Sequence, residues 1–305
     1  MNNFYQKYLK DVLKIIKYKD YIILEDRDGK KYYILKGNKE VEDVYSYLEE
    51  IQYPYSVDYI NNIEESYLLF PYYEDSINDI SYKAKILIEG ILFLQLKSIE
   101  YRDVSSELIS EMYDKSVRKL DSLMEYYNTL QDTIEKGPFS PSTYFLLNHI
   151  SEFYLNIEYS RREIEKFYRY QNGRLRYSYQ INKPYLNNFR VGERKYFLNL
   201  LDMKKDLLYL DLISFFRMDG LLFDMISFFD LYQNKISFDF FELSFFFSKI
   251  LIPNRLELSS SSYLDTIKIR REIDYLRKVR EFYLEENKKY QETNQEEFKE
   301  KNEDI

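Results

Sequence analysis

The residues with the most chemical potential gather in one stretch, residues 175–217, which reads LRYSYQINKPYLNNFRVGERKYFLNLLDMKKDLLYLDLISFFR. A short polar segment at 180–188 is followed by two strand-like runs that Val-Gly-Glu-Arg joins at 191–194. An acidic loop comes next, and a helix is expected to begin near Asp211. This order of polar loops and short structured runs makes the stretch the candidate site. The rest of the chain is expected to position it.

Several kinds of site are excluded by residue counts. His149 is the only histidine, and the chain has no cysteine. Disulfide frameworks, thiol nucleophiles and metal sites of histidine and thiolate ligands are therefore not expected. A Ser-His-Asp triad is not expected either, because His149 falls in a predicted helix after Pro141 and no serine is flanked by glycines. We expect His149 to pack between helices.

The first part of the chain has the pattern of a small α+β lobe, residues 1–71. Alternating apolar and polar residues predict strands, Asp28-Gly29 predicts a hairpin turn, and one helix is expected among the strands. The predicted strands are 12–18, 21–25, 31–36, 55–60 and 66–70, and the helix is 38–51. Pro71 ends the last strand, so residues 72–79 are expected to form a hinge.

From residue 80 the apolar residues recur with a helical period, which predicts a larger, mainly helical lobe over 80–290. Residues 105–170 are expected to form a helical hairpin, because Gly137-Pro138 ends one long helix and Ser140-Pro141 caps the next. Later helices are predicted at 207–218, 222–231, 238–251 and 266–290. Residues 291–305 are expected to be an acidic tail.

Composition limits the possible partners. With 305 residues and a hydrophobic fraction of 45%, the chain can bury a sizeable core. Its net charge of −8 argues against binding to a phosphate backbone, so no nucleic-acid partner is expected. Signal-peptide features are missing from its start, and every apolar run falls short of the roughly 20 residues that a membrane helix needs. We expect a soluble, cytoplasmic protein without a membrane partner.

The order of elements resembles the aminoglycoside phosphotransferase and choline kinase branch of the protein-kinase-like fold. Within that branch it is most similar to degenerate firmicute members such as spore-coat proteins of the CotS type. Lys36, in YYILKG, resembles the strand lysine that holds ATP phosphates, with Glu42 or Glu49 on the next helix as its partner. The resemblance implies an α+β, bilobed fold with an antiparallel-sheet N-lobe and a helical C-lobe.

The catalytic loop of this family reads His-Gly-Asp, four residues and Asn. Aligning its final asparagine with Asn188 places Ile181, Asn182 and Lys183 at the His, Gly and Asp positions. The resemblance then implies that a lysine replaces the general base, and a charged lysine cannot accept the proton of a substrate hydroxyl. No catalytic residue is expected in this degenerate loop.

The metal aspartate of the family corresponds to Asn199, seven residues before Asp206, and an amide is a weaker Mg²⁺ ligand than a carboxylate. In an alternative register Asp202 takes the metal role, so that Asn188 and Asp202 hold one ion. That register restores no general base. Asp211 is expected to cap its helix or to bond the preceding loop.

These replacements predict a catalytically inactive, pseudokinase-type protein that acts as a binding or scaffold module for a protein partner, without a cofactor. Two alternatives stay open within the fold: an active small-molecule phosphotransferase that uses ATP and Mg²⁺ through Asp202, and a purely structural protein, such as a spore-coat component, whose cleft is filled. A third possibility, a helical bundle with a strand appendage, predicts no antiparallel sheet of about five strands in residues 10–70.

Overall fold

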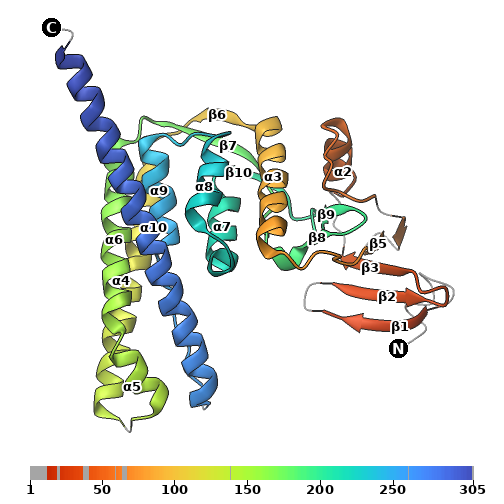
Figure 1. Cartoon of the computed structure of the whole chain (residues 1–305), viewed down its shortest axis with the longest axis horizontal. Helices are drawn as coiled ribbons and strands as arrows, with labels where there is room; N and C mark the ends of the chain where they lie inside the picture. The colour runs from red at the N-terminus through yellow and green to blue at the C-terminus, as the bar shows by residue number, and fades with distance from the viewer. Residues whose placement is uncertain are drawn as a thin grey trace. The chain divides into compact units, whose positions relative to one another are not determined.

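The computed structural model describes residues 12–18, 21–36, 41–58, 60–63, 67–137, 139–259 and 261–303 (Figure 1). The chain divides into two compact units. Unit 1 comprises Met1–Tyr101 and Arg176–Phe223, and unit 2 comprises Arg102–Leu175 and Asp224–Ile305. The lobe, hinge and tail boundaries expected from the sequence stay predictions.

Unit 1 contains an antiparallel sheet of five strands in the order β1-β2-β3-β5-β4. Its presence excludes the helical bundle with a strand appendage. The Asp28-Gly29 turn is confirmed, since Gly29 has a φ of 76° that suits glycine. The strands are β1 (Val12–Lys17), β2 (Ile22–Asp26), β3 (Lys31–Lys36), β4 (Asn61–Ile63) and β5 (Tyr67–Pro71).

One predicted strand, at 55–60, is absent from the residues described there. Residues 53–58 instead form an irregular segment after α2 (Val41–Glu50). The segment is held by bonds to distant residues: the Tyr53 hydroxyl donates to the Gly90 carbonyl at 3.1 Å, and the Phe197 amide donates to the Tyr55 carbonyl at 3.0 Å. The second bond satisfies the Tyr55 carbonyl, a main-chain group that a strand would have paired with a neighbouring strand.

The two faces of this sheet pack into different clusters. Ile23, Tyr33, Leu35, Leu68 and Phe70 belong to one buried cluster, against which Tyr45 of α2 packs. Leu24, Ile34 and Leu69 form the other cluster. Successive residues of a strand point to opposite faces, so α2 covers the face that carries Tyr33 and Leu35.

The remainder of unit 1 contains the candidate stretch. A long helix, α3 (Ile80–Ser98), begins at Asp79, whose side chain accepts a hydrogen bond from the Tyr82 amide. The candidate stretch itself forms β7 (Arg174–Gln180), the short helix η1 (Leu186–Asn188), β8 (Phe189–Val191), β9 (Lys195–Phe197), β10 (Lys204–Leu207), α7 (Leu210–Asp219) and the short helix η2 (Gly220–Leu222). Strand β7 pairs antiparallel with β10 in a sheet of order β10-β7-β6, where β6 is Glu100–Asp103.

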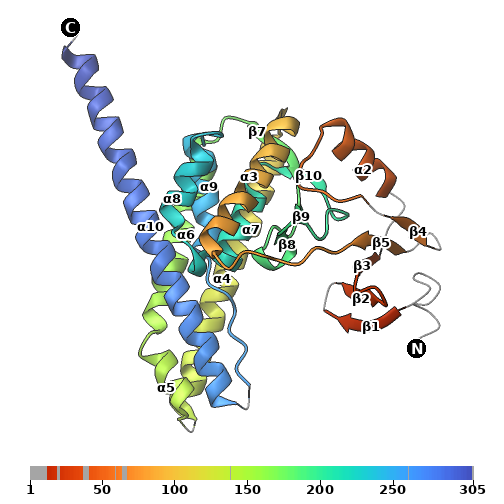
Figure 2. The ribbon, with the colours of Figure 1, turned by 45° about the vertical axis from the view of Figure 1, so that its right-hand side comes forward.

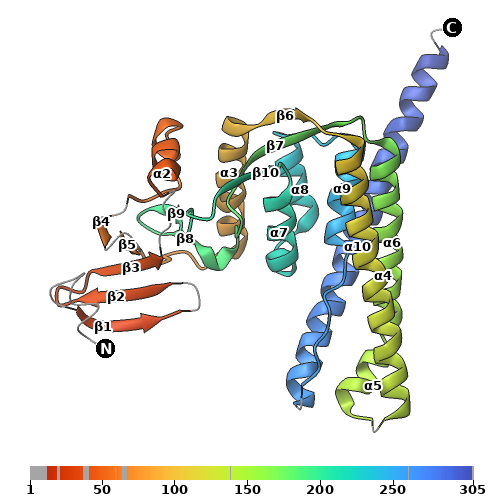
Figure 3. The same cartoon turned by 180° about the vertical axis from the view of Figure 1, so that it is seen from behind.

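Unit 2 is helical. Figure 3 shows α4 (Ser106–Lys136) and α6 (Ile150–Tyr170) side by side, with α5 (Pro141–Leu147) at the turn between them. Helices α8 (Met225–Gln233) and α9 (Phe240–Ile250) follow, and α10 (Ser262–Glu303) lies along α6 (Figure 2). Their core is aromatic: Phe229 contacts the rings of Phe246 and Phe282 at centroid distances of 5.2 and 5.1 Å. In the described part of both units, no helix is long and apolar enough to cross a membrane.

The prediction of one continuous helix around His149 is wrong. Helix α5 ends at Leu147, and His149 has a non-helical backbone at the start of α6. Its ring nitrogen Nδ1 lies 2.9 Å from the Phe145 carbonyl, and its ring packs on that of Phe145. The histidine therefore stabilises the turn between two helices. Among the residues described, no cluster of histidine, cysteine and carboxylates could hold a metal ion.

Gly192 lies where the β8–β9 hairpin meets the segment after β5. The Val191 amide donates to the Asp75 carboxylate at 2.8 Å, and the Ser76 amide donates to the Val191 carbonyl at 3.0 Å. A Cβ at residue 192 would overlap the main-chain carbonyl oxygen of Glu74. Only glycine allows this close approach.

We expect Gly192→Ala to lower the free energy of unfolding by roughly 1–3 kcal/mol, because one of two main-chain segments must move. Urea unfolding followed by circular dichroism measures the change. The matched control is Glu193→Ala, an exposed neighbour whose loss should leave stability within about 0.5 kcal/mol. Equal stability of the two variants would contradict the close-approach role.

Candidate functional site

The loop that follows β7 is fixed by one buried carboxylate. Asp211, in the first turn of α7, is 1% exposed. Its two oxygens accept hydrogen bonds from the Ile181 amide at 2.6 Å and from the Asn182 amide at 3.0 Å. The expectation that Asp211 caps its helix or bonds the loop directly before it is wrong: α7 has Tyr209 at its N-cap with no side-chain cap bond, and Asp211 bonds a loop thirty residues earlier.

Burial raises the pKa of Asp211 to about 7, from an ordinary value of 3.8. The two amide hydrogen bonds oppose this rise because they favour the charged form, while the nearby charge of Asp206 adds to it. The carboxyl group therefore changes protonation near neutral pH. The amide hydrogen bonds that hold the loop are stronger when the group is charged.

A chain of buried amides supports this carboxylate, and the sequence analysis did not identify it. The Gln95 side chain of α3 donates to the Leu208 carbonyl at 2.6 Å and to the Gln180 side chain at 3.2 Å. The Gln180 oxygen in turn accepts from the Asp211 amide at 2.9 Å. Gln95 is fully buried in an otherwise apolar part of α3, and that single polar residue was the only signal in the sequence. The network joins α3, β7 and α7.

Asn182 has a φ of 75°, the left-handed region that glycine adopts most easily and that asparagine tolerates better than most residues. The family that the sequence resembles has glycine at the position aligned with Asn182. The backbone thus fits the register in which Ile181, Asn182 and Lys183 replace His, Gly and Asp. Ile181 is buried, whereas Lys183 is half-buried.

Asn188 is the last residue of this loop, and its side chain forms a hydrogen bond within the loop. The Asn188 amide nitrogen donates to the Lys183 carbonyl at 3.2 Å, and its main-chain carbonyl accepts from the Leu198 amide at 2.7 Å. A second buried carboxylate, Asp219, accepts from the Leu186 amide at 2.7 Å. The loop is therefore closed by its own hydrogen bonds and by α7.

The structure brings two of the predicted metal residues together. The Asn199 amide nitrogen donates to the Asp202 carboxylate at 3.1 Å, and the Asn199 oxygen accepts from the Leu201 amide at 2.9 Å. The amide oxygen that Mg²⁺ would need is thus engaged in a turn. Asp202 is exposed, and no direct contact between Asn188 and Asp202 is found in the described residues. This arrangement does not fit a Mg²⁺ site.

The structure does not bring Lys36 and its predicted partners together. Lys36 is exposed at the end of β3 and pairs with Tyr67, which belongs to the cluster on the far side of the sheet from α2. In the part of the chain that the structure describes, Lys36 forms no ion pair with Glu42 or Glu49. The residue before Lys36, the buried Leu35, is the one whose side chain faces α2.

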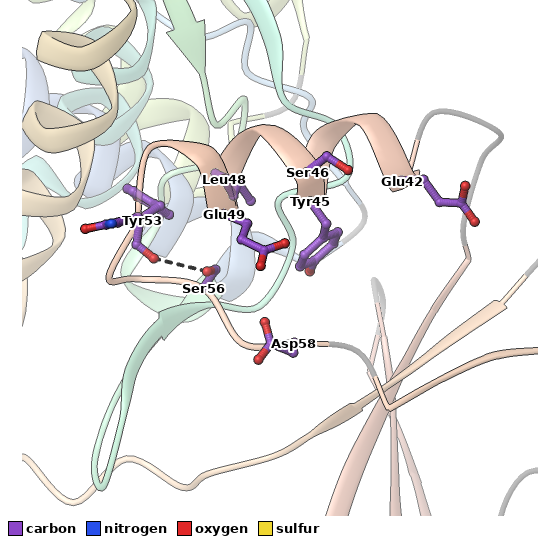
Figure 4. A pocket seen from close by; sticks show the side chains of 9 residues that line it. Glu42, Tyr45, Ser46, Leu48, Glu49, Tyr53, Ser56 and Asp58 are labelled. Atoms are coloured by element: carbon purple, nitrogen blue, oxygen red, sulfur yellow. Dashed lines mark hydrogen bonds between the residues drawn. The ribbon is translucent and has the colours of Figure 1, made fainter.

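Glu42 and Glu49 line a different space, a pocket of about 710 Å³ beside α2. In Figure 4, Glu49 and Asp58 point into the gap between α2 and residues 53–58, with Tyr45 beside them. Among the residues that the structure describes, its lining is acidic and hydroxylic and includes no basic residue. A phosphate group would be repelled by such a lining.

Aromatic side chains fill the space between the α2-facing side of the sheet and the loop around Asn199. Tyr33 is fully buried and stacks on Phe70 at a centroid distance of 4.8 Å and on Tyr196 at 6.3 Å. Leu198 and Leu201, which flank Asn199, belong to the same cluster. The Tyr196 hydroxyl also accepts from the Tyr73 amide at 2.9 Å. These contacts occupy the interior that joins sheet and loop.

A buried arginine fastens the segment after β5 to the same hairpin, and this residue too was not predicted. The Arg190 guanidinium donates to the Tyr21 hydroxyl at 2.9 Å, to the Tyr72 hydroxyl at 3.3 Å and to the Asn187 carbonyl at 2.9 Å. The Asp75 carboxylate lies 3.7 Å away and bonds Lys83 at 2.7 Å. Charge and hydrogen bonds thus join Tyr21, the residue before β2, to the segment at 72–75 and to β8.

Comparison with solved structures identifies the fold. An aminoglycoside phosphotransferase from Alicyclobacillus acidocaldarius matches with a TM-score of 0.61 and 8% identity, over 88% of this chain and 92% of that chain. The AMP-bound spectinomycin phosphotransferase matches with a TM-score of 0.60 and 12% identity, over 91% and 96%. Choline kinase from Streptococcus pneumoniae gives 0.43 and 11%, over 89% and 96%.

The first two likenesses show that the chain has the protein-kinase-like α+β fold of the aminoglycoside phosphotransferases. The fold class expected from the sequence is therefore confirmed. At identities of 8% and 12%, the likeness concerns the fold alone. Neither the protein-family models nor the curated proteins compared with the sequence contain a match.

The raised pKa of Asp211 makes a prediction for stability. The folded state binds this proton more tightly than the unfolded state, so the contribution to stability is full below the ordinary pKa and is lost as pH rises through about 7. Between about pH 5.5 and 8, we expect the wild type to lose roughly 2 kcal/mol of unfolding free energy relative to Asp211→Asn, which does not titrate. Urea unfolding at both pH values measures the difference.

The control is Asp202→Asn, which removes an exposed carboxylate from the same unit. Its difference from the wild type should change little over this pH range. If the Asp211→Asn difference were equally constant, the pKa of Asp211 would not be raised.

Proposed function

We propose that this protein is a catalytically inactive member of the kinase-like fold that acts as a binding or scaffold module. One observation carries the proposal: Tyr33, Phe70 and Tyr196 pack together between the sheet and the loop that contains Asn199. In kinases the strand lysine pairs with a glutamate of the following helix, so the nucleotide side of the sheet is the side that this helix covers. Here that side carries buried apolar residues.

The loop chemistry supports the same proposal. Lys183 stands where the family has its general base, and an ammonium group has no lone pair with which to accept a proton. In the alignment above, Asn199 takes the place of the family's metal aspartate, and its amide oxygen accepts a hydrogen bond from the Leu201 amide. No step of phosphoryl transfer can be assigned to these side chains as they are arranged. We therefore expect no ATP or Mg²⁺ requirement.

Binding would then use the outer surface, because the interior between sheet and loop is occupied. A cleft filled by the protein's own side chains is also what the alternative of a purely structural protein expects, and the binding of a partner to the outer surface would distinguish the two. The chemistry of the partner and an association with the spore coat stay predictions.

The rival is an active phosphotransferase with Asp202 as its metal ligand. Asp202 does lie beside Asn199, with 3.1 Å between its carboxylate and the Asn199 amide nitrogen. The rival requires that nucleotide and Mg²⁺ enter a space that Tyr33 and Tyr196 now occupy. It also requires a general base, for which the loop at 181–188 offers no carboxylate or histidine.

Thermal unfolding with ATP separates the two. A ligand at about 100 times its Kd adds about 2.7 kcal/mol to the unfolding free energy, which is a clear rise in Tm. We expect no rise with millimolar ATP, whether Mg²⁺ or EDTA is present. A rise that needs Mg²⁺, disappears in Asp202→Ala and persists in the control Glu193→Ala would overturn the proposal.

A further inference from the structure

A surface groove of about 670 Å³ in unit 1 borders the segment after β5. Three tyrosines and a proline supply its apolar lining: Tyr32 of β3, Pro71 at the end of β5, and Tyr72 and Tyr73 after it. All four residues are partly exposed, so each has surface that a ligand can contact. We call this site the tyrosine groove.

The two tyrosines after β5 are held in place by neighbouring residues. The Tyr72 amide donates to the Lys31 carbonyl at 2.9 Å, and the Tyr72 ring meets the buried Tyr33 ring edge-on at a centroid distance of 6.3 Å. The Tyr73 amide donates to the Tyr196 hydroxyl at 2.9 Å, and the two rings meet edge-on at 6.0 Å. The tyrosine groove is therefore formed before a ligand binds, which lowers the entropy cost of binding.

Both of these tyrosines have a hydroxyl hydrogen to donate. The Tyr72 oxygen accepts a hydrogen bond from the Arg190 guanidinium at 3.3 Å. Among the residues described, no acceptor takes the hydroxyl hydrogen of Tyr72 or of Tyr73. A ligand that satisfies these donors has to present acceptors, such as carbonyl oxygens.

The charges that line the tyrosine groove balance one another. Lys30 and Glu193 carry opposite signs. The other charged residues of the lining are held in two ion pairs: Lys31 with Glu74, and Asp75 with Lys83. A highly charged ligand, such as a phosphate backbone or a polyamine, therefore finds no excess of opposite charge in the groove. The complementary ligand is uncharged.

We propose that the tyrosine groove binds a proline-rich segment of a partner protein in the polyproline II conformation. Such a segment is uncharged, leaves its carbonyl oxygens free and packs on aromatic side chains. Strand addition has no free edge here, because β3 already pairs with β2 on one side and with β5 on the other. An amphipathic helix would need a broad hydrophobic groove, whereas the apolar lining here is tyrosine and proline.

This inference rests on the proposed function, in which a protein partner binds the outer surface, and it names the chemistry of that partner. The two can fail separately. A partner that bound elsewhere would leave the proposed function standing without the tyrosine groove, and the ATP measurement tests the proposed function on its own.

The test is fluorescence anisotropy with a dye-labelled decaproline peptide. We expect saturable binding to the wild type and a loss of about tenfold or more in affinity in Tyr73→Ala, which removes an aromatic face of the groove. Tyr73→Phe keeps the ring and removes only the hydroxyl, so it should fold like the wild type and bind about threefold to tenfold more weakly. Circular dichroism shows that both variants are folded.

The matched control is Tyr144→Ala, which removes an exposed tyrosine of α5 in unit 2 and should bind decaproline like the wild type. A labelled Gly-Ser peptide of the same length should not bind the wild type. The inference is overturned if decaproline does not bind the wild type, or if Tyr73→Ala and Tyr73→Phe both bind it as tightly as Tyr144→Ala does. Absence of decaproline binding without any effect of ATP would remove this inference alone, whereas a Mg²⁺-dependent effect of ATP would remove the proposed function.

Discussion

The carboxylate of Asp211 is the constraint on which unit 1 depends. A buried carboxylate is tolerated only when strong donors surround it, and here the donors are the amides of Ile181 and Asn182. Because those amides belong to the loop after β7, satisfying the carboxylate fixes where the loop lies. The Gln95 and Gln180 side chains then position the start of α7 against β7 and α3. The loop is thus held in place by these hydrogen bonds, although its own side chains offer no general base. Because Asp211 bonds main-chain groups of the loop, the position of the loop does not depend on which side chains the loop carries.

Aromatic side chains fill the interior between the sheet and the loop around Asn199. In unit 1, Tyr33 stacks on Phe70 and on Tyr196, with interplanar angles of 13° and 25°. Each ring is large, so few residues are needed to fill the gap between the sheet and the loop. The tyrosine hydroxyls require partners, and Tyr196 finds one in the Tyr73 main chain. Polar bonds and packing therefore act at the same point. A ligand that entered this space would have to displace both.

Much of the fold could be predicted from the sequence, because periodicity and turn residues are local. Strands β1, β2, β3 and β5, the Asp28-Gly29 turn and the helix cap at Ser140 follow from nearby residues, whereas β4 was not predicted. The face on which Lys36 lies could not be predicted, since a shift of one residue along a strand reverses the direction of every side chain. Nor could the cluster of Tyr33, Phe70 and Tyr196, whose members are far apart in sequence. Asp211 was expected to cap its helix or to bond the loop directly before it, and its actual partners, Ile181 and Asn182, come close to it only in the folded chain.

Arg190 adds a further argument about motion. A phosphotransferase opens and closes its cleft in each turnover, so the segment between sheet and helices has to bend. In this protein that segment is held: Tyr72 and Tyr21 bond the Arg190 guanidinium, Asp75 accepts the Val191 amide, and Gly192 allows the backbone of residue 74 to come close. These bonds come from Tyr21 just before β2, from the segment itself and from β8, so bending at the segment would break several of them together. A filled interior and a segment held by several bonds each hinder the opening of a cleft, and each makes unit 1 more rigid.

A binding or scaffold module gains from rigidity, because less conformational entropy is lost when a partner binds a preformed surface. The packed interior and the bonded segment at 72–75 therefore support the proposed function without reference to the side chains of the loop at 181–188.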